Sequence, residues 1–133
     1  MHTLGDHLRK ARLDRGLSQP EVARLLKVTP DTVTGWELNR YEPTIKCAGA
    51  IIAFLGYFPF TLDDCSLGKQ LYYARLITGK TQQEVAQEIG CDESNLRRIE
   101  LDQRRPQTKT YKKIQTYINA TLTSYGLRVT PRQ

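Results

Sequence analysis

Residues 4–23 read LGDHLRKARLDRGLSQPEVA, and residues 67–86 read LGKQLYYARLITGKTQQEVA. Without a gap, the same offset of 63 positions aligns residues 4–46 with residues 67–109 and gives 15 identical pairs. Self-similarity at a fixed offset is the sequence signature of a repeated structural unit. The chain therefore contains two copies of one module, copy 1 and copy 2. The identical pairs are Leu4/Leu67, Gly5/Gly68, Leu8/Leu71, Ala11/Ala74, Arg12/Arg75, Leu13/Leu76, Gly16/Gly79, Gln19/Gln82, Glu21/Glu84, Val22/Val85, Ala23/Ala86, Glu37/Glu100, Leu38/Leu101, Pro43/Pro106 and Lys46/Lys109.

Each copy is predicted to begin with two short helices. Apolar residues at positions 4, 8 and 11 have helical spacing, and Gly16 or Gly79 is placed to end the first helix. Ser18 with Glu21, and Thr81 with Glu84, form the capping-box pattern that opens a second helix. This second helix is expected to run to about residue 26 in copy 1 and residue 89 in copy 2.

A turn of about three residues and two further helices complete each copy. Thr29 or Asp92 is placed to cap the third helix, and Asn39 or Asp102, which tolerate the left-handed conformation, to close it. The fourth helix follows a proline and reads TIKCAGAIIAFL in copy 1. In copy 2 it carries a longer apolar stripe, for which we expect core or interface packing. The stripe consists of Tyr111, Ile114, Tyr117, Ile118, Leu122 and Tyr125.

The repeat predicts two domains, at residues 1–58 and 66–125. Between them, residues 59–65 form an apolar linker, and residues 126–133 form a C-terminal tail. The segment around the linker is aromatic and unlike a flexible Gly/Ser tether. Tyr57, Phe58 and Phe60 are therefore expected to pack between the copies and fix their relative placement.

The second and third helices of each copy, joined by a tight turn, make a helix-turn-helix. The pattern S/T-Q-x-E-V-A, then a capping Thr or Asp, then W/I-E and a later Pro, resembles the lambda repressor/Cro class, the XRE-like helix-turn-helix family. The resemblance covers residues 3–55 and 66–122 and implies an all-α fold with two tandem lambda-repressor-like domains of four to five short helices each. Lys27 departs from the family pattern, which usually has Gly before the turn, whereas Gly90 keeps it.

The same resemblance implies two structural ion pairs. In this family the Arg of the first helix commonly pairs with the Glu that follows the Trp position. Here the pairs are Arg12 with Glu37 and Arg75 with Glu100. We expect them to maintain the fold, because removing one member of a partly buried pair leaves an uncompensated charge.

The third helix of each copy is expected to read DNA. Val33 with Trp36, and Leu96 with Ile99, are three residues apart and should face the core, so the other positions face outward. In the major groove Arg suits guanine, Asn suits adenine, Glu or Asp suits cytosine, and Thr offers a hydroxyl or a methyl group. The predicted base-reading residues are Asp31, Thr32, Thr34 and Gly35 in copy 1, and Glu93, Ser94, Asn95, Arg97 and Arg98 in copy 2.

The two reading sets differ in chemistry. Copy 1 has no Arg, Lys, Gln or Asn among these positions, so it is expected to be the weaker or more apolar reader. Gly35 would allow close approach of the backbone to DNA. For Arg97 and Arg98 the alternative is contact with phosphate alone. Phosphate contacts that fix the register without reading sequence are expected from Gln19, Thr29, Arg40, Lys46, Gln82, Arg104, Arg105 and Lys109.

Composition limits the classes of function. The net charge is +6, and a basic run between Arg97 and Lys113 suits a polyanionic partner. Three distant cysteines and two histidines near the N-terminus lack zinc-ligand spacing, so neither a metal nor another cofactor is expected. No apolar run reaches bilayer-spanning length, and the N-terminus lacks a signal-peptide pattern. The expected location is the cytoplasm, in association with the nucleoid, with no membrane partner.

The leading hypothesis is a sequence-specific regulator of transcription that binds double-stranded DNA. The resemblance implies a bacterial or phage-type protein, a repressor above all, that places two recognition helices in successive major grooves. Homodimerisation or a protein partner is left open. The alternatives are a protein-interaction module of the anti-activator or antitoxin type, and an accessory factor in recombination or excision with weak DNA binding. An enzyme is not expected, because no nucleophile–base set, paired carboxylates or phosphate-binding glycine loop is present.

Overall fold

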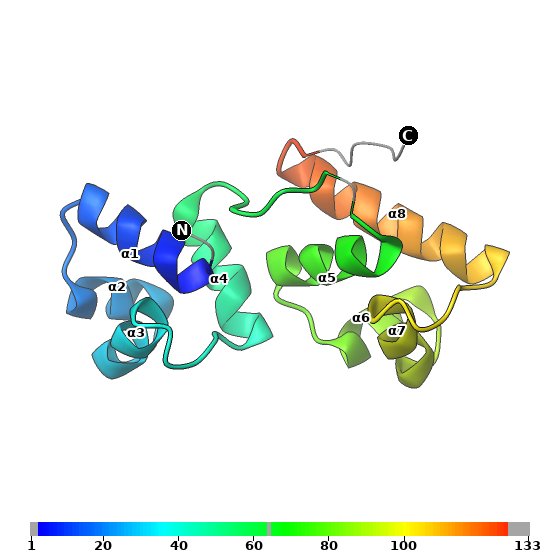
Figure 1. The fold of residues 1–133 in the computed structure, drawn as a ribbon, viewed down its shortest axis with the longest axis horizontal. Helices are drawn as coiled ribbons and strands as arrows, with labels where there is room; N and C mark the ends of the chain where they lie inside the picture. Colours follow the sequence, from blue (N-terminus) through cyan, green and yellow to red (C-terminus); the bar gives the residue numbers. More distant parts are fainter. Residues whose placement is uncertain (1–2, 64, 128–133) are drawn as a thin grey trace. The chain divides into compact units, whose positions relative to one another are not determined.

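The computed structural model describes residues 3–63 and 65–127, and within these residues the chain forms eight helices and no strand (Figure 1). It divides into two compact units, Met1–Pro59 and Phe60–Gln133, which we call unit 1 and unit 2. Unit 1 holds copy 1 and unit 2 holds copy 2. The predicted all-α class with two tandem domains of four to five short helices is confirmed, and the described residues of each unit form four.

The helices of the two units correspond one to one. Unit 1 contains α1 (Leu4–Asp14), α2 (Gln19–Leu26), α3 (Pro30–Glu37) and α4 (Ile45–Leu55). Unit 2 contains α5 (Leu67–Thr78), α6 (Gln82–Ile89), α7 (Glu93–Glu100) and α8 (Thr108–Ser124). Within each unit the short second and third helices pack together, and the first helix packs against the third and the fourth (Figure 1). The helix-turn-helix is thus α2–α3 in unit 1 and α6–α7 in unit 2.

Local capping signals fix where these helices start. Ser18 with Glu21, and Thr81 with Glu84, form complete capping boxes at the starts of α2 and α6, as predicted. The predicted caps of the third helices are also confirmed, because Thr29 accepts from the backbone N–H of Thr32 at 3.3 Å. Asp92 does the same for Asn95 at 3.3 Å. Each bond satisfies a backbone donor that the helix leaves unpaired.

Left-handed residues end the helices and turn the chain. Asn39 and Asp102, at φ 58° and 59°, follow the third helices as predicted. At the turn of the helix-turn-helix, Gly90 has φ 83° and Lys27 has φ 58°. Copy 1 therefore keeps the same turn geometry without glycine, and Lys27 adopts a conformation that is unfavourable for a residue with a Cβ atom.

One side of each third helix is buried, as the spacing predicted. Val33 is 0% exposed and Trp36 3%, while Leu96 and Ile99 in unit 2 are 0% and 1% exposed. The apolar stripe of α8 is correct for Ile114, Ile118 and Leu122. Tyr111 is not in the core, because it is 44% exposed and its hydroxyl accepts a hydrogen bond from Gln115, and interface packing of this residue stays a prediction.

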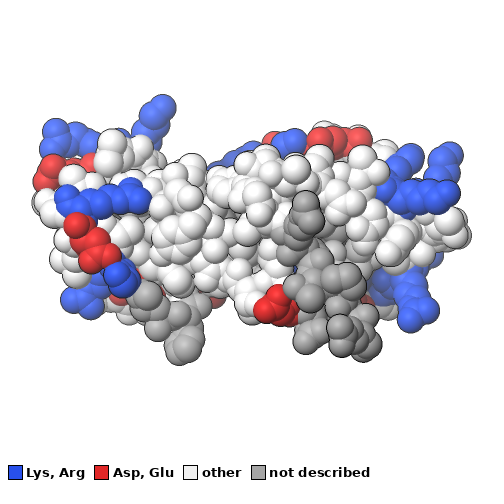
Figure 2. Space-filling view, turned by 90° about the horizontal axis from the view of Figure 1, so that it is seen from above, with Lys and Arg blue, Asp and Glu red and all other residues white. Residues whose placement is uncertain are grey.

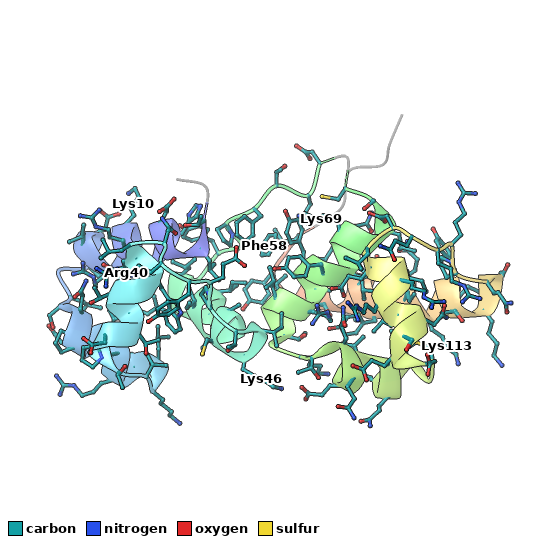
Figure 3. The ribbon with its side chains drawn as sticks, turned by 60° about the horizontal axis from the view of Figure 1, so that its bottom comes forward. Lys10, Arg40, Lys46, Phe58, Lys69 and Lys113 are labelled. Carbon is teal, nitrogen blue, oxygen red and sulfur yellow. The ribbon has the colours of Figure 1, made fainter. Side chains whose placement is uncertain are left out.

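The aromatic residues around the predicted linker contact residues within each unit. Tyr57 lies edge-on to His7 in unit 1, with Tyr57 Oη 3.0 Å from His7 Nδ1. Phe60 stacks on Tyr73 in unit 2, with 5.6 Å between the ring centroids. Phe58 is buried (Figure 3). Whether these three residues also fix the placement of the units stays a prediction, and the predicted tail lies outside the described residues from position 128 onward.

Three further observations concern the described residues as a set. Cys47, Cys65 and Cys91 are half-buried free thiols. Within the described ranges no group of three or more His, Cys, Asp or Glu side chains is arranged to hold a metal ion. None of the helices in this part of the chain has the length and apolar character needed to cross a bilayer.

Candidate nucleic-acid interface

A bidentate Arg–Glu ion pair holds each third helix on its buried side. Arg12 Nε and Nη2 donate to the two carboxylate oxygens of Glu37 at 2.7 and 2.9 Å, and this hydrogen bonding raises the pKa of Arg12. In unit 2, Arg75 Nε and Nη2 donate to Glu100 at 2.7 and 2.5 Å. All four side chains are at most 12% exposed. The pairs therefore lie in the scaffold, away from the surface that DNA would meet.

A glutamine at the start of the second helix is bound to the same carboxylate. Gln19 Nε2 donates to Glu37 Oε1 at 3.2 Å, and Gln82 Nε2 donates to Glu100 Oε1 at 3.3 Å. One amide hydrogen of each predicted phosphate-binding glutamine is thus used inside the protein. Pro20 has no N–H, and Glu21 and Glu84 donate theirs to the capping residues. The backbone N–H groups placed to meet a phosphate are therefore that of Gln19 in α2 and those of Gln82 and Gln83 in α6.

Two further repeated contacts hold the third helix, and the sequence reading did not identify them. A Cβ atom on Gly5 would lie 2.0 Å from the backbone O of Trp36, and one on Gly68 would lie 2.4 Å from the backbone O of Glu100. Asn39 Oδ1 accepts from Thr3 Oγ1 at 2.7 Å, and Asp102 Oδ2 accepts from Ser66 Oγ at 2.8 Å. The retained glycines were the available signal, since an identical glycine inside a helix indicates close approach of another backbone.

The outward face of α7 is polar and basic. Glu93, Ser94, Arg97 and Arg98 are all exposed, whereas Leu96 and Ile99 face the core. Within the described residues, no side-chain hydrogen bond or ion pair engages Arg97 or Arg98. The structure thus brings together most of the predicted reading set of copy 2 on one face, with two guanidinium groups available to a partner.

Asn95, the remaining predicted reader of copy 2, has a different environment. It is half-buried, and its Oδ1 is buried without a hydrogen-bond partner among the described residues. A buried unpaired polar atom is destabilising by about 1–3 kcal/mol. Asn95 is therefore less exposed than its neighbours and is poorly satisfied in the protein without DNA.

The threonine hydroxyls of α3 are engaged within unit 1. Thr34 Oγ1 lies 2.8 Å from Gln19 Oε1 and 3.1 Å from the backbone O of Pro30, and it donates its proton in this direction. The hydroxyls of Thr29 and Thr32 bond to each other at 2.8 Å. The hydroxyl proton of Thr34 and one of the two hydroxyl protons of the Thr29–Thr32 pair are thus used internally. Asp31 is the one predicted reader of α3 that is exposed.

Gly35 is buried, because the side chain of Tyr41 covers it. A Cβ atom at Gly35 would lie 2.3 Å from Cζ of the Tyr41 ring. The close backbone approach expected at this glycine is made by the protein's own tyrosine in this structure. The sequence reading did not identify Tyr41, although a large aromatic residue six positions after a helical glycine was visible.

The cations that follow the third helices are exposed in both units. Arg40 follows α3 and Lys46 lies at the start of α4 (Figure 3). In unit 2, Arg104, Arg105 and Lys109 are exposed. Figure 2 shows, from one side, that Lys and Arg side chains project from both units with acidic side chains among them.

The first turn of α8 adds to the positive potential of unit 2. Its N-cap residue, Gln107, makes no side-chain cap bond, whereas Thr44 caps α4 by accepting from Cys47 at 3.4 Å. A helix N-terminus carries a partial positive charge, and its free N–H groups bind anions. Arg104, Arg105 and Lys109 therefore lie near the start of α8, where backbone N–H groups also favour binding of phosphate.

Comparison with known proteins assigns the family. The model of the helix-turn-helix family HTH_3 matches the chain twice, at residues 8–60 and 71–124. Searches of curated proteins and of solved structures each gave no match. The two matched segments contain most of both units, including α2–α3 and α6–α7. The chain therefore belongs to the helix-turn-helix family HTH_3 and is a DNA-binding helix-turn-helix regulator with two tandem copies of the fold.

Proposed function

We propose that this protein is a sequence-specific repressor of transcription in which unit 2 carries most of the base reading. In this proposal α7 lies in the major groove and Arg97 and Arg98 donate to guanine, while bound protein blocks access to a promoter. The observation that carries it is the outward face of α7, where both guanidinium groups are exposed and unengaged within the described residues. A base edge or a phosphate supplies the acceptors that these groups lack in the protein.

Phosphate anchoring is assigned to the residues around the third helices. Arg104, Arg105 and Lys109 are exposed beside the uncapped start of α8. Arg40 and Lys46 hold the equivalent region of unit 1. Such contacts release counterions, so affinity should fall steeply with salt. Gln19, Gln82 and Thr29 would contribute mainly through backbone N–H groups, because their side chains already have partners.

Both units are proposed to bind one DNA duplex. We take residues 1–58 and 66–125 as the two domains and 59–65 as the linker, so that α3 and α7 occupy successive major grooves. The family's usual arrangement of two half-sites about 34 Å apart would then be reached by one chain or by a homodimer. This action on DNA would take place in the cytoplasm, in association with the nucleoid.

Binding to DNA from the protein's own genomic neighbourhood tests the proposal. Arg97→Ala combined with Arg98→Ala should remove most of the selectivity for that DNA over an unrelated duplex, with a loss of roughly 100-fold in specific affinity. Arg104→Ala or Lys109→Ala should weaken binding to both duplexes equally and reduce the slope of log affinity against log salt by about one. Gel shifts over a salt series measure both effects.

A matched control separates base reading from the loss of charge. Arg9→Ala combined with Arg24→Ala removes the same charge from exposed positions on α1 and α2, outside the proposed reading face. This variant should retain selectivity. If the Arg97/Arg98 variant bound as selectively as wild type, those residues would not be the readers.

One observation favours a second candidate, a protein-interaction module. The outward face of α3 presents Asp31 and no Lys or Arg, and its hydroxyl groups are bonded internally. An acidic face of this kind is repelled by phosphate. If wild-type protein failed to bind any duplex at low salt, this candidate would replace the repressor.

A further inference from the structure

The ring of Tyr41 lies along one face of α3. A Cβ atom at Gly35 would be 2.3 Å from both Cζ and Oη of the tyrosine, and 2.5 Å from Cε1. The hydroxyl donates to the backbone O of Asp31 at 3.3 Å. Residues 31 and 35 are four apart and share a face of the helix. The hydroxyl end of the ring therefore lies on this face, over Gly35 and beside the carbonyl of Asp31.

The covered face of α3 is the one that points outward in unit 2. At the repeat offset, Asp31, Gly35 and Tyr41 correspond to Ser94, Arg98 and Arg104. These three residues of unit 2 are exposed. The Tyr41 ring thus takes the position from which the Arg98 side chain leaves α7.

Positions 35 and 41 differ between the copies in a coupled way. With Tyr41 in its observed position, even the methyl group of an alanine at position 35 would overlap the ring. Unit 2 has a long side chain at the first of these positions and no aromatic residue at the second. Gly35 and Tyr41 of unit 1 therefore depend on each other, because the absence of a side chain at Gly35 leaves the space that the Tyr41 ring occupies.

Although the Tyr41 ring packs against Gly35, much of it stays accessible to a partner. Tyr41 is 49% exposed, although it covers Gly35 completely enough to make that residue buried. Its hydroxyl makes one long hydrogen bond, to a backbone carbonyl. A tyrosine held in this way loses little conformational freedom when a second surface packs on it.

We propose that Tyr41 is the specificity-determining residue of unit 1, and that its ring contacts base edges in place of a side chain at position 35. This inference rests on the proposed binding of DNA. The ring edge is apolar and suits the C5-methyl group of thymine, while the hydroxyl, which donates its proton to Asp31, can accept from a base edge. Unit 1 should therefore prefer A·T pairs, where unit 2 prefers guanine contacts through Arg97 and Arg98.

In vitro selection from randomised duplexes, with the full chain, tests this role. The base preferences that survive in the Arg97→Ala, Arg98→Ala variant identify the part of the bound sequence read by unit 1. Tyr41→Ala should remove these preferences, lower the affinity for the selected duplex roughly tenfold, and leave the unit 2 preferences intact. Tyr41→Leu should do the same while keeping an apolar side chain over Gly35.

Tyr57→Ala is the matched control, because Tyr57 is a 44% exposed tyrosine of the same unit that lies against His7. It should leave all preferences unchanged. If Tyr41→Leu kept the unit 1 preferences, or if every preferred base depended on Arg97 and Arg98, the role of Tyr41 would be disproved and the proposed function would stand. If wild-type protein selected no sequence at all, both proposals would fail.

Discussion

The two third helices, α3 and α7, are held from behind by the same contacts and present different surfaces in front. Each is bound by an Arg–Glu pair, a glutamine bond to the same Glu, and a glycine contact at its C-terminal end. In front, α7 presents Arg97 and Arg98, whereas α3 presents Asp31 and the Tyr41 ring. The contacts with the rest of each unit therefore constrain the buried side of the third helix, whereas the residues on its outward side can differ between the copies.

Breaking the ion pair should have the largest effect and should be equal in the two units. Glu37→Ala or Glu100→Ala leaves a guanidinium group buried without its partner, which should destabilise the affected unit by about 3–5 kcal/mol. Native-state hydrogen exchange measures each unit separately. A loss below about 1 kcal/mol in either unit would contradict a shared scaffold. Lys10→Ala, which removes an exposed ion pair with Asp14, is the control.

Filling the glycine contacts should have the next largest effect. Gly5→Ala and Gly68→Ala place a methyl group against a backbone carbonyl that cannot move as a flexible side chain would. We expect a loss of about 3 kcal/mol in the corresponding unit, at the upper end of overpacking costs. Unchanged exchange rates in both variants would disprove the close approach.

Replacing Asn95 should separate stability from reading. Asn95→Thr installs the residue that copy 1 has at this place and removes the buried, unpaired Oδ1. Unit 2 should gain about 1 kcal/mol of stability, because the desolvated acceptor is gone. The proposed selectivity at the base read by Asn95 should be lost at the same time. Thermal unfolding and gel shifts measure the two effects, and a loss of stability would contradict the assigned environment.

Relaxing the turn of unit 1 should have the smallest effect. Lys27→Gly removes a Cβ atom from a left-handed position, so unit 1 should gain about 1 kcal/mol. Trp36 is the only tryptophan of the chain and lies in the core of unit 1, so its fluorescence reports urea unfolding of that unit. Gly90→Ala should cost unit 2 a similar amount. A midpoint unchanged by Lys27→Gly would show that unit 1 accommodates the lysine without strain.

The sequence predicted the features that depend on neighbouring residues. The capping boxes at Ser18 and Thr81 and the buried faces of α3 and α7 follow from spacings of three or four residues, which helix geometry fixes. The repeat then predicted two domains of the same fold, because the same capping and spacing patterns occur in the same order in both copies.

The candidate site was less predictable, because its decisive contacts join residues from different elements. Tyr41 reaches Gly35 through the loop after α3, whose path is set by packing and by no local periodicity. Thr34 was expected to offer its hydroxyl outward, but a helical threonine can bond a backbone carbonyl one turn earlier, and Gln19 lies within reach as well. Asn95 was counted as a groove residue, although it is half-buried and its backbone N–H donates to the N-cap residue Asp92.

The contact between Gly35 and Tyr41 also constrains the order in which the copies could diverge. In an ancestor with a side chain at position 35, a tyrosine at position 41 would have had no place to lie along the helix. A tyrosine at position 41 could therefore take its observed place on the helix only once the side chain at position 35 was lost. The two substitutions are epistatic, and either one reversed alone is expected to be worse than both reversed together.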